Sequence, residues 1–328
     1  MRELGRQHQL GREAIHTAWD HDLPPRLTVA PGDTVVFDTL DASYGRVARH
    51  VQDHPGDLDP ALVALIAAGS YPTPPDAGGG HPLTGPVAVT GAAPGDTLVV
   101  EILHVTPGAW GCTFSPPGTG LLSDEITELA VHIWDCRDGQ TALFAPGIRV
   151  PLAPFCGVMG VALAEPGQHS TFPPRPTGGN MDIRQLTAGA TLYLPVQVPD
   201  ALFSLGDVHG AQGDGEVSGT GIEMEATVTV RFDLRQGPPI RQPQFRTPTQ
   251  VAVPAGPYFA TTGHDPDLRE AAREALRGML DHLEREHGLT RIPAYLLASA
   301  CVDLKISQIV DEPNFTVSAF LPLSVFMT

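Results

Sequence analysis

Alternating apolar and polar residues predict a series of short strands in the first two thirds of the chain. The clearest case is 222–234, where the apolar members are Met224, Ala226, Val228, Val230 and Phe232. A period of two is typical of a strand with one buried face. Pro-Gly-Asp turns at 31–33 and 94–96 each precede an apolar, β-branched run. They predict two strand–turn–strand units and indicate a duplicated β unit.

Further strands follow in the middle of the chain. The Asp138–Gly139 pair predicts a hairpin turn. GVMGVALAEPG (157–167) is interpreted as a glycine-flanked strand and TLYLPVQV (191–198) as the next one. The segment between them, 169–186, has no periodicity of its own and is expected to be an irregular loop.

The pattern changes to a period of three to four near the C-terminus. Apolar residues at this spacing predict one long helix over 265–289, with Asp265 as its N-cap, Pro266 at its first position and Gly288 as its stop. Shorter helices are predicted within 59–69 and 291–306, and a closing strand over 315–326. The expected fold is mainly β, with barrel- and sandwich-like β units and an α+β C-terminal segment.

The same pattern divides the chain into three expected regions. Residues 1–155 form an N-terminal β region with the duplicated turn units, 156–245 a central β region, and 246–328 the α+β region. With 42% hydrophobic residues the chain can build a sizeable core, and we expect the regions to pack as one compact unit.

Charge and cysteine content narrow the classes of function. The net charge of −17 argues against nucleic acid and against an anionic membrane surface as partners. The N-terminal stretch lacks the apolar run of a signal peptide and no segment resembles a membrane span, so we expect a soluble, cytoplasmic protein. Four cysteines without a CxxC spacing are interpreted as buried thiols.

An acidic, glycine-rich stretch, GDVHGAQGDGE (206–216), is the first candidate for chemistry. Asp207 and His209 are two residues apart, and on an extended segment such a pair points to one side, where it can bind a divalent metal. Glu216 is a candidate third ligand or a general base. The alternative is a glycine-rich turn with a solvated histidine, and the spacing alone leaves both interpretations open.

A second candidate is GGNMD (178–182). The amides of Gly178 and Gly179 and the side chain of Asn180 can bind a developing oxyanion, and Asp182 can join a metal site. A turn in which Asn and Asp bond to their own backbone is the favoured alternative. Both candidate segments are expected to be loops that flank the strand 191–198, which spans roughly 26 Å. They can meet only if that strand bends or one loop folds back.

Three weaker candidates remain. Glu128, with Glu125 beside it, can serve as a general base, although a solvated turn is favoured. His16 and its acidic neighbours are interpreted as a polar N-terminal arm rather than as ligands. Cys156, before a glycine, can be a nucleophile, although a small core residue is the favoured interpretation.

Taken together, these segments resemble the acetamidase/formamidase family. The resemblance rests on GGNMD followed by LTAGATLYLPVQVPDALFSLGDVHGAQGDGEVSGTGIE, and on PGDTVVFDTLDA, LTGPVAVTGAAPGDTLVVEI, GVMGVALAEPG and VDLKISQIVDEPNFTVSAFLP in the same order. It implies hydrolysis of the C–N bond of a small linear amide such as formamide or acetamide. It also implies a divalent metal, with zinc first and calcium as a second-site alternative. Thr177 stands where many members have a histidine.

The resulting hypothesis is a metal-assisted amidase. Asp207, His209 and Asp182 bind the metal, Glu216 or Glu128 moves the proton, and Asn180 with Gly178 and Gly179 stabilises the oxyanion. Arg175 is the candidate for binding a carboxylate-bearing or larger amide. The alternatives are a Cys156-dependent amidase and a non-catalytic β protein that binds a metal or small ligand. A homodimer or homotetramer is expected.

Overall fold

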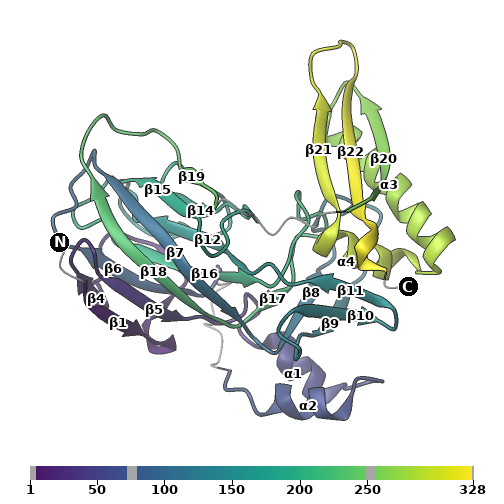
Figure 1. The fold of residues 1–328 in the computed structure, drawn as a ribbon, viewed down its shortest axis with the longest axis horizontal. Coiled ribbons are helices and arrows are strands. Elements are labelled where there is room, and N and C mark those ends of the chain that lie inside the picture. Colours follow the sequence, from purple (N-terminus) through teal and green to yellow (C-terminus); the bar gives the residue numbers. More distant parts are fainter. Residues whose placement is uncertain (1–4, 72–79, 249–255, 327–328) are drawn as a thin grey trace. The chain divides into compact units, whose positions relative to one another are not determined.

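The structure is a computed structural model that describes residues 5–71, 80–248 and 256–326 (Figure 1). The chain divides into two compact units, each made of segments that are distant in sequence. The first unit comprises 1–108, 154–209 and 224–251, and the second comprises 109–153, 210–223 and 252–328. The expected mainly β fold with an α+β C-terminal segment is confirmed. The three-region division stays a prediction.

The first unit contains a six-stranded sheet in the order β1-β5-β18-β7-β15-β19. The pairs are antiparallel except for β1 with β5. The strands are β1 (Gln7–Leu10), β5 (Thr34–Asp38), β7 (Thr97–Pro107), β15 (Thr191–Pro195), β18 (Ala226–Arg235) and β19 (Gln244–Arg246). The alternation predicted over 222–234 is present in β18, where Val228, Val230 and Phe232 are fully buried.

A second set of strands in this unit is ordered β6-β16-β12-β14, and β2 and β4 pair with β6. These strands are β2 (Ile15–His16), β4 (Leu27–Val29), β6 (Leu83–Val89), β12 (Phe155–Val161), β14 (Gly178–Asn180) and β16 (Phe203–His209). Every residue of β6, β12 and β16 is buried. Burial of every residue is typical of strands covered on both faces.

One hydrophobic core joins the two sheets of this unit. Phe203 of β16 packs edge-on against Phe37 of β5 and Phe232 of β18, with ring centroids 6.2 and 5.1 Å apart. Val100, Met159 and Leu194 belong to the same buried cluster. The sheets therefore form a sandwich, and β16 lies in the layer that carries the chemistry described below. Two short strands, β3 (Ala18–Trp19) and β13 (His169–Ser170), pair beside it.

The two Pro-Gly-Asp turns have the same local structure. Gly32 and Gly95 have φ values of 97° and 98°, a region that favours glycine. Asp33 accepts a hydrogen bond from the amide of Ala30, and Asp96 accepts one from the amide of Ala93, both at 3.0 Å. The turns link β4 to β5 and β6 to β7, so each turn joins one sheet of the sandwich to the other.

The second unit contains a four-stranded meander and an α+β part. The meander is ordered β11-β10-β9-β8, with β8 (Trp110–Ser115), β9 (Ala130–Asp135), β10 (Thr141–Ala145) and β11 (Ile148–Pro151). The predicted hairpin at Asp138–Gly139 joins β9 to β10. A separate sheet, β20-β22-β21, consists of β20 (Tyr258–Asp265), β21 (Asp303–Gln308) and β22 (Phe315–Pro322).

Two helices accompany this small sheet. Helix α3 (Leu268–His287) packs along β20 and β22 (Figure 1). A Cβ at Gly263 of β20 would lie 2.0 Å from the carbonyl oxygen of Ala271, so the contact is close. Helix α4 (Arg291–Cys301) follows, and Gly288 ends α3 in the left-handed conformation, as predicted. In the part of the chain that the structure describes, no helix is long and apolar enough to cross a bilayer.

Three details of the sequence-based prediction are wrong. The N-cap of α3 is Asp267, whose side chain accepts from the amides of Arg269 and Glu270, and not Asp265. The eight-residue helix α1 (Arg46–Asp53) is missing from the prediction, although α2 (Pro60–Ala67) matches the helix expected at 59–69. The third correction concerns the two candidate segments. Gly178–Asn180 and Gly206–His209 belong to strands β14 and β16 rather than to loops. Their apolar neighbours and ladder hydrogen bonds override the glycine signal.

Candidate metal and active site

Strand β16 presents Asp207 and His209 inside the protein. Both side chains are buried, and His209 Nε2 lies 3.5 Å from Asp207 Oδ2. The ring of His209 also packs edge-on against Phe155, at 5.1 Å between centroids. The predicted proximity of these two residues is therefore confirmed, but it occurs within a buried strand and not on a solvated turn.

Asp182 reaches the same place from the other side of β12. Strand β12 pairs with β16 through Val158 opposite Gly206, and with β14 through Val158 opposite Asn180. Asp182 follows two residues after the end of β14, and its amide donates to the carbonyl of Gly157 at 3.2 Å. Both candidate segments thus flank β12, which removes the separation expected from the strand 191–198. That strand, β15, lies in the other sheet.

Gly157 is the residue over which the two carboxylates meet. A Cβ built on it would lie 2.6 Å from Asp182 Oδ1 and 2.7 Å from Asp207 Oδ2. At these distances a side chain at position 157 would have to displace the carboxylates. Glycine inside an apolar strand often marks the close approach of another group. The absence of a side chain at position 157 is therefore what allows both carboxylates to occupy this space.

The close approach of these groups alters the acidity of Asp182. Burial raises the pKa of Asp182 to about 7, while the neighbouring His209 lowers this pKa and Asp207 raises it. Burial penalises the charged carboxylate, and a second carboxylate nearby adds like-charge repulsion. A positive charge in their midst would relieve both effects.

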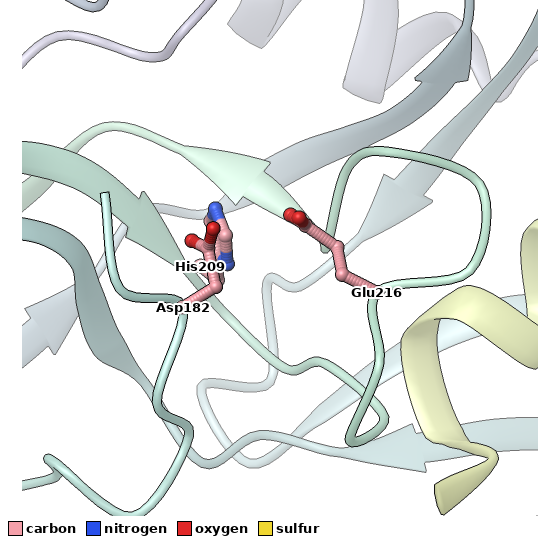
Figure 2. A group of neighbouring side chains, drawn as sticks. All are labelled: Asp182, His209 and Glu216. Atoms are coloured by element: carbon pink, nitrogen blue, oxygen red, sulfur yellow. The ribbon is translucent and has the colours of Figure 1, made fainter. Parts of the chain in front are cut away.

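Glu216 completes one group of candidate ligands. Figure 2 shows its side chain extending from the loop after β16 toward His209 and Asp182, and one ligand atom from each of the three lies within 4.8 Å of the others. Glu216 has a φ of 42°, which is unusual for a residue with a Cβ. A second group joins Asp207 and His209 to Glu223, which is buried.

Sequence reasoning missed three members of this neighbourhood. His81, just before β6, places Nε2 at 3.9 Å from Asp207 Oδ2. No spacing rule links it to β16. Glu223 occupies a polar position of the alternating stretch 222–234, so the alternation predicts an exposed side chain and gives no signal that Glu223 is buried. Gly157 is signalled only by its place inside the buried FCGVMGV strand.

The residues of the GGN segment, Gly178 to Asn180, differ in whether their polar groups are free to bind a substrate. Gly178 and Gly179 adopt φ values of 97° and 95°, and the amide of Gly178 donates to the carbonyl of Arg175 at 3.0 Å. This amide is already engaged, which weakens its candidacy as an oxyanion donor. Asn180 differs, since Oδ1 is buried and has no hydrogen-bond partner among the described residues. The Arg175 guanidinium donates to the carbonyl of Pro173 at 2.8 Å.

Thr177 is buried, and its carbonyl accepts a hydrogen bond from Val161 at 3.1 Å. Position 177 therefore supplies a threonine side chain and not the imidazole that many family members have there. A second imidazole nevertheless reaches Asp207 from His81. Among the described residues, Nδ1 of His81 is buried without a hydrogen-bond partner, while the backbone amide of His81 donates to Thr171 Oγ1 at 2.6 Å.

The remaining candidates lie in different surroundings. Glu128 is exposed in the loop before β9. Cys156 is fully buried in the core, and burial raises the pKa of its thiol to about 12, with Asp207 adding to the effect. A thiol of this kind is a poor nucleophile at neutral pH. His16 is not on a free arm, because its Nε2 lies 2.8 Å from Ser204 Oγ.

The side chains around Gly157 suit a divalent cation. Two groups of three side chains share His209, one with Asp182 and Glu216 and the other with Asp207 and Glu223. Carboxylate and imidazole donor sets of this kind bind zinc and similar metals. Buried anionic groups are normally compensated by positive charge. The orphaned nitrogen of His81 and oxygen of Asn180 add polar atoms that a hydrated ion or a substrate can engage.

Comparison with known proteins gives this arrangement a family context. The model of the Acetamidase/Formamidase family matches residues 3–167 and 162–328. The chain belongs to the acetamidase/formamidase family. Among its relatives is the formamidase of Methylophilus methylotrophus, 28% identical over 95% of this chain and 89% of the relative. The acetamidase of Mycolicibacterium smegmatis is 27% identical over 68% of this chain and 66% of the acetamidase.

Solved structures extend the family comparison to three dimensions. A gamma lactamase from Delftia acidovorans has a TM-score of 0.80 at 26% identity, covering 95% of this chain and 89% of its own. The acetamidase from Bacillus halodurans has a TM-score of 0.63 at 31% identity, covering 97% and 98%. This member of the acetamidase/formamidase family therefore has the fold of proteins named for the hydrolysis of amide bonds.

Proposed function

We propose that this acetamidase/formamidase family member is an amidase that hydrolyses the C–N bond of a small linear amide to a carboxylate and ammonia. The single observation that carries the proposal is the convergence of Asp182, His209 and Glu216, with Asp207 beside His209. The names of the relatives, formamidase and acetamidase, support the substrate class.

Asp182, Asp207 and His209 are proposed to hold a divalent metal. Zinc is the first candidate because imidazole and carboxylate are among its usual ligands. Calcium is the weaker proposal, since it takes six to eight oxygen ligands and both candidate groups contain a histidine. A cation bound here supplies a water of lowered pKa and polarises the amide carbonyl.

The proton transfers are assigned to Glu216. Its carboxylate accepts a proton from the attacking water and delivers it to the leaving nitrogen, so that ammonia departs in place of an amide anion. Glu128 remains a candidate for this role, but it is exposed and belongs to neither group of converging ligands. We therefore favour Glu216.

Asn180 is proposed to orient the substrate. Its buried, unbonded Oδ1 can accept a hydrogen bond from the amide NH2, and its own amide can donate to the carbonyl oxygen. Gly179 keeps the predicted oxyanion role as a proposal, whereas the amide of Gly178 is bonded to Arg175. Arg175 is proposed to select amides that carry a carboxylate, through a bidentate contact.

The test is ammonia release by the purified protein from formamide, acetamide, a longer aliphatic amide and succinamate. We expect turnover of at least one, loss of activity after chelation, and its return on adding zinc. Full activity in protein shown to be metal-free would remove the metal from the proposal. Absence of ammonia release from every amide, in protein that holds a tightly bound ion, would favour the non-catalytic binding alternative.

A second candidate activity is hydrolysis of a γ-lactam. It is favoured by the TM-score of 0.80 with the gamma lactamase, against 0.63 with the acetamidase. The same group of residues can open a cyclic amide, in which case the product is an amino acid and no ammonia appears. Including γ-butyrolactam in the panel, with amine detection, separates the two activities.

Assembly and location are proposed from the sequence alone. A homodimer or homotetramer is the expected assembly, and light scattering after size-exclusion chromatography tests it. A monomer at micromolar concentration would overturn it. Cytoplasmic location stays a prediction, to be checked by fractionation of cells that express the chain.

A further inference from the structure

The loop that carries Glu216 is fixed by side chains of helix α4. This loop, 210–223, and helix α4 belong to the same unit of the protein. The backbone of Glu216 donates to the carbonyl of Gly213 at 3.1 Å and accepts from the amide of Gly219 at 2.8 Å. These bonds place Glu216 within a tight turn, and contacts on either side of this turn fix the backbone that carries its side chain.

Ser299 bonds to both ends. Its carbonyl accepts from the amide of Gly213 at 2.8 Å, before Glu216. Its hydroxyl accepts from the amide of Ser218 at 3.1 Å and donates to the carbonyl of Thr220 at 2.7 Å, after Glu216. One fully buried residue thus closes the loop on either side of the proposed base.

Tyr295 supports the same loop one helical turn earlier. Residues four apart lie on the same face of a helix, so Tyr295 and Ser299 face the loop together. The Tyr295 hydroxyl donates to the carbonyl of Val217, next to Glu216, and accepts from the amide of Leu122 at 3.2 Å. Tyr295 is fully buried.

A third anchor follows α4. Asp303 Oδ1 accepts from the amide of Asp214 at 3.1 Å, and the amide of Leu304 donates to the carbonyl of Asp214 at 2.7 Å. A Cβ at Gly213 would lie 2.0 Å from the carbonyl of Val302, so the loop lies directly against the chain there. These contacts leave the backbone around Glu216 little freedom.

We infer that Ser299 and Tyr295 are positioning residues that hold Glu216 for proton transfer. The inference rests on the proposed function, because it acts through Glu216. Neither residue touches substrate in this assignment. Each acts by fixing the backbone on which the carboxylate is carried, and misplacement of a catalytic group by about 1 Å can cost a hundredfold in rate.

The experiment is a double-mutant cycle on kcat for the best amide of the panel. Ser299→Ala is expected to lower kcat by about 10- to 100-fold while KM and bound metal stay within about twofold. Tyr295→Phe, which deletes one hydroxyl, is expected to lower kcat by about 3- to 10-fold. In a Glu216→Gln background, both changes should have no further effect on kcat, because the group they position is gone.

Ser318→Ala is the matched control. Ser318 is equally small, buried in β22 of the same unit, and bonds to Ser307 Oγ at 2.7 Å without touching the loop. It should leave kcat unchanged in either background. Thermal unfolding of every variant separates activity changes from loss of fold, and Tyr295→Phe keeps the test decisive if Ser299→Ala does not fold.

The failures are distinguishable. If Glu216→Gln retains wild-type kcat, the proposed role of Glu216 is wrong. If Glu216→Gln loses activity but Ser299→Ala and Tyr295→Phe act equally in both backgrounds, or not at all, the positioning role is overturned while the proposed function stands.

Discussion

The two parts of the candidate site are fixed by different means. Asp207 and His209 are carried by β16, a fully buried strand with hydrogen-bonded neighbours on both sides. Glu216 is carried by an irregular loop that side chains of α4 hold in place. A strand ladder is distributed over many bonds and tolerates the loss of one. The loop is held by a small number of contacts, among them the hydroxyls of Ser299 and Tyr295, so single substitutions in α4 should affect the base more than the ligands.

The largest effect is expected from the strand-borne ligands. Asp207→Asn should abolish metal binding and lower kcat/KM by about a thousandfold or more, because a buried charged ligand is lost. Metal content by mass spectrometry and ammonia release measure the two effects. Asp200→Asn is the control, since Asp200 is exposed and shares the left-handed backbone of Asp207, with φ values of 59° and 55°. Asp207→Asn protein that keeps its metal would show that β16 does not carry the ligand.

The second-largest effect is expected at Glu216, the proposed base, which the loop carries. Glu216→Gln should lower kcat by about 10²- to 10⁴-fold while the metal is retained, because proton transfer is lost and ligation is not. Glu128→Gln, the matched change at the rival position, should alter kcat less than about twofold, as expected for an exposed surface residue. The reverse outcome would assign the base to Glu128. Metal loss in Glu216→Gln would make Glu216 a third ligand and remove the contrast between strand and loop.

A smaller effect on metal affinity is expected from Gly157, over which the two carboxylates meet. Gly157→Ala should weaken metal binding by about 10- to 100-fold, because the new Cβ pushes Asp182 and Asp207 apart. Titration with zinc in competition with a chelator measures it. Gly278→Ala serves as control, as a Cβ there meets nothing nearer than 3.4 Å and the residue lies within α3. Unchanged zinc affinity in folded Gly157→Ala would mean that the carboxylates do not need this space.

The smallest effect concerns pH. The raised pKa of Asp182, about 7, means that zinc must displace a proton below neutrality, so apparent affinity should rise by about tenfold per pH unit up to pH 7 and then level off. Because the pKa of Asp182 in the folded protein is raised, this carboxyl stabilises the metal-free fold at low pH, and the stabilisation is lost as pH rises through 7. Asp182→Asn should flatten this dependence. A wild-type affinity that is flat from pH 5.5 to 7 would contradict it.

Sequence patterns predicted strands better than their partners. The alternation in β18, the Pro-Gly-Asp turns and the α3 stop at Gly288 follow from local chemistry and are confirmed. The glycine-rich stretches at 178 and 206 were expected to be loops, because glycine is a turn signal whenever only neighbours in sequence are considered. Here the glycines allow strands β14, β12 and β16 to approach closely, a reason that exists only in three dimensions.

The candidate site was predicted in part for the same reason. Asp207 and His209 share a strand, so their two-residue spacing was informative. Glu216 was a candidate because it lies in the same glycine-rich stretch, and Asp182 because it follows the GGN segment. The pairing of both β14 and β16 with β12 explains how Asp182 comes close to Asp207. His81 gave no signal, because it reaches Asp207 from a segment more than a hundred residues away. The three-region division and the proposed residue roles stay predictions.

The paired Pro-Gly-Asp corners have a mechanical consequence. Each corner carries the chain from one sheet of the sandwich into the other, through β4 to β5 and β6 to β7. Strand β6 is also bonded to β16, and β7 to β18. Each corner is a covalent link of a few residues, so it limits how far β4 can slide past β5 and how far β6 can slide past β7. Because β6 is bonded to β16, the corner between β6 and β7 restrains sliding of the sheets beside the strand that carries Asp207 and His209.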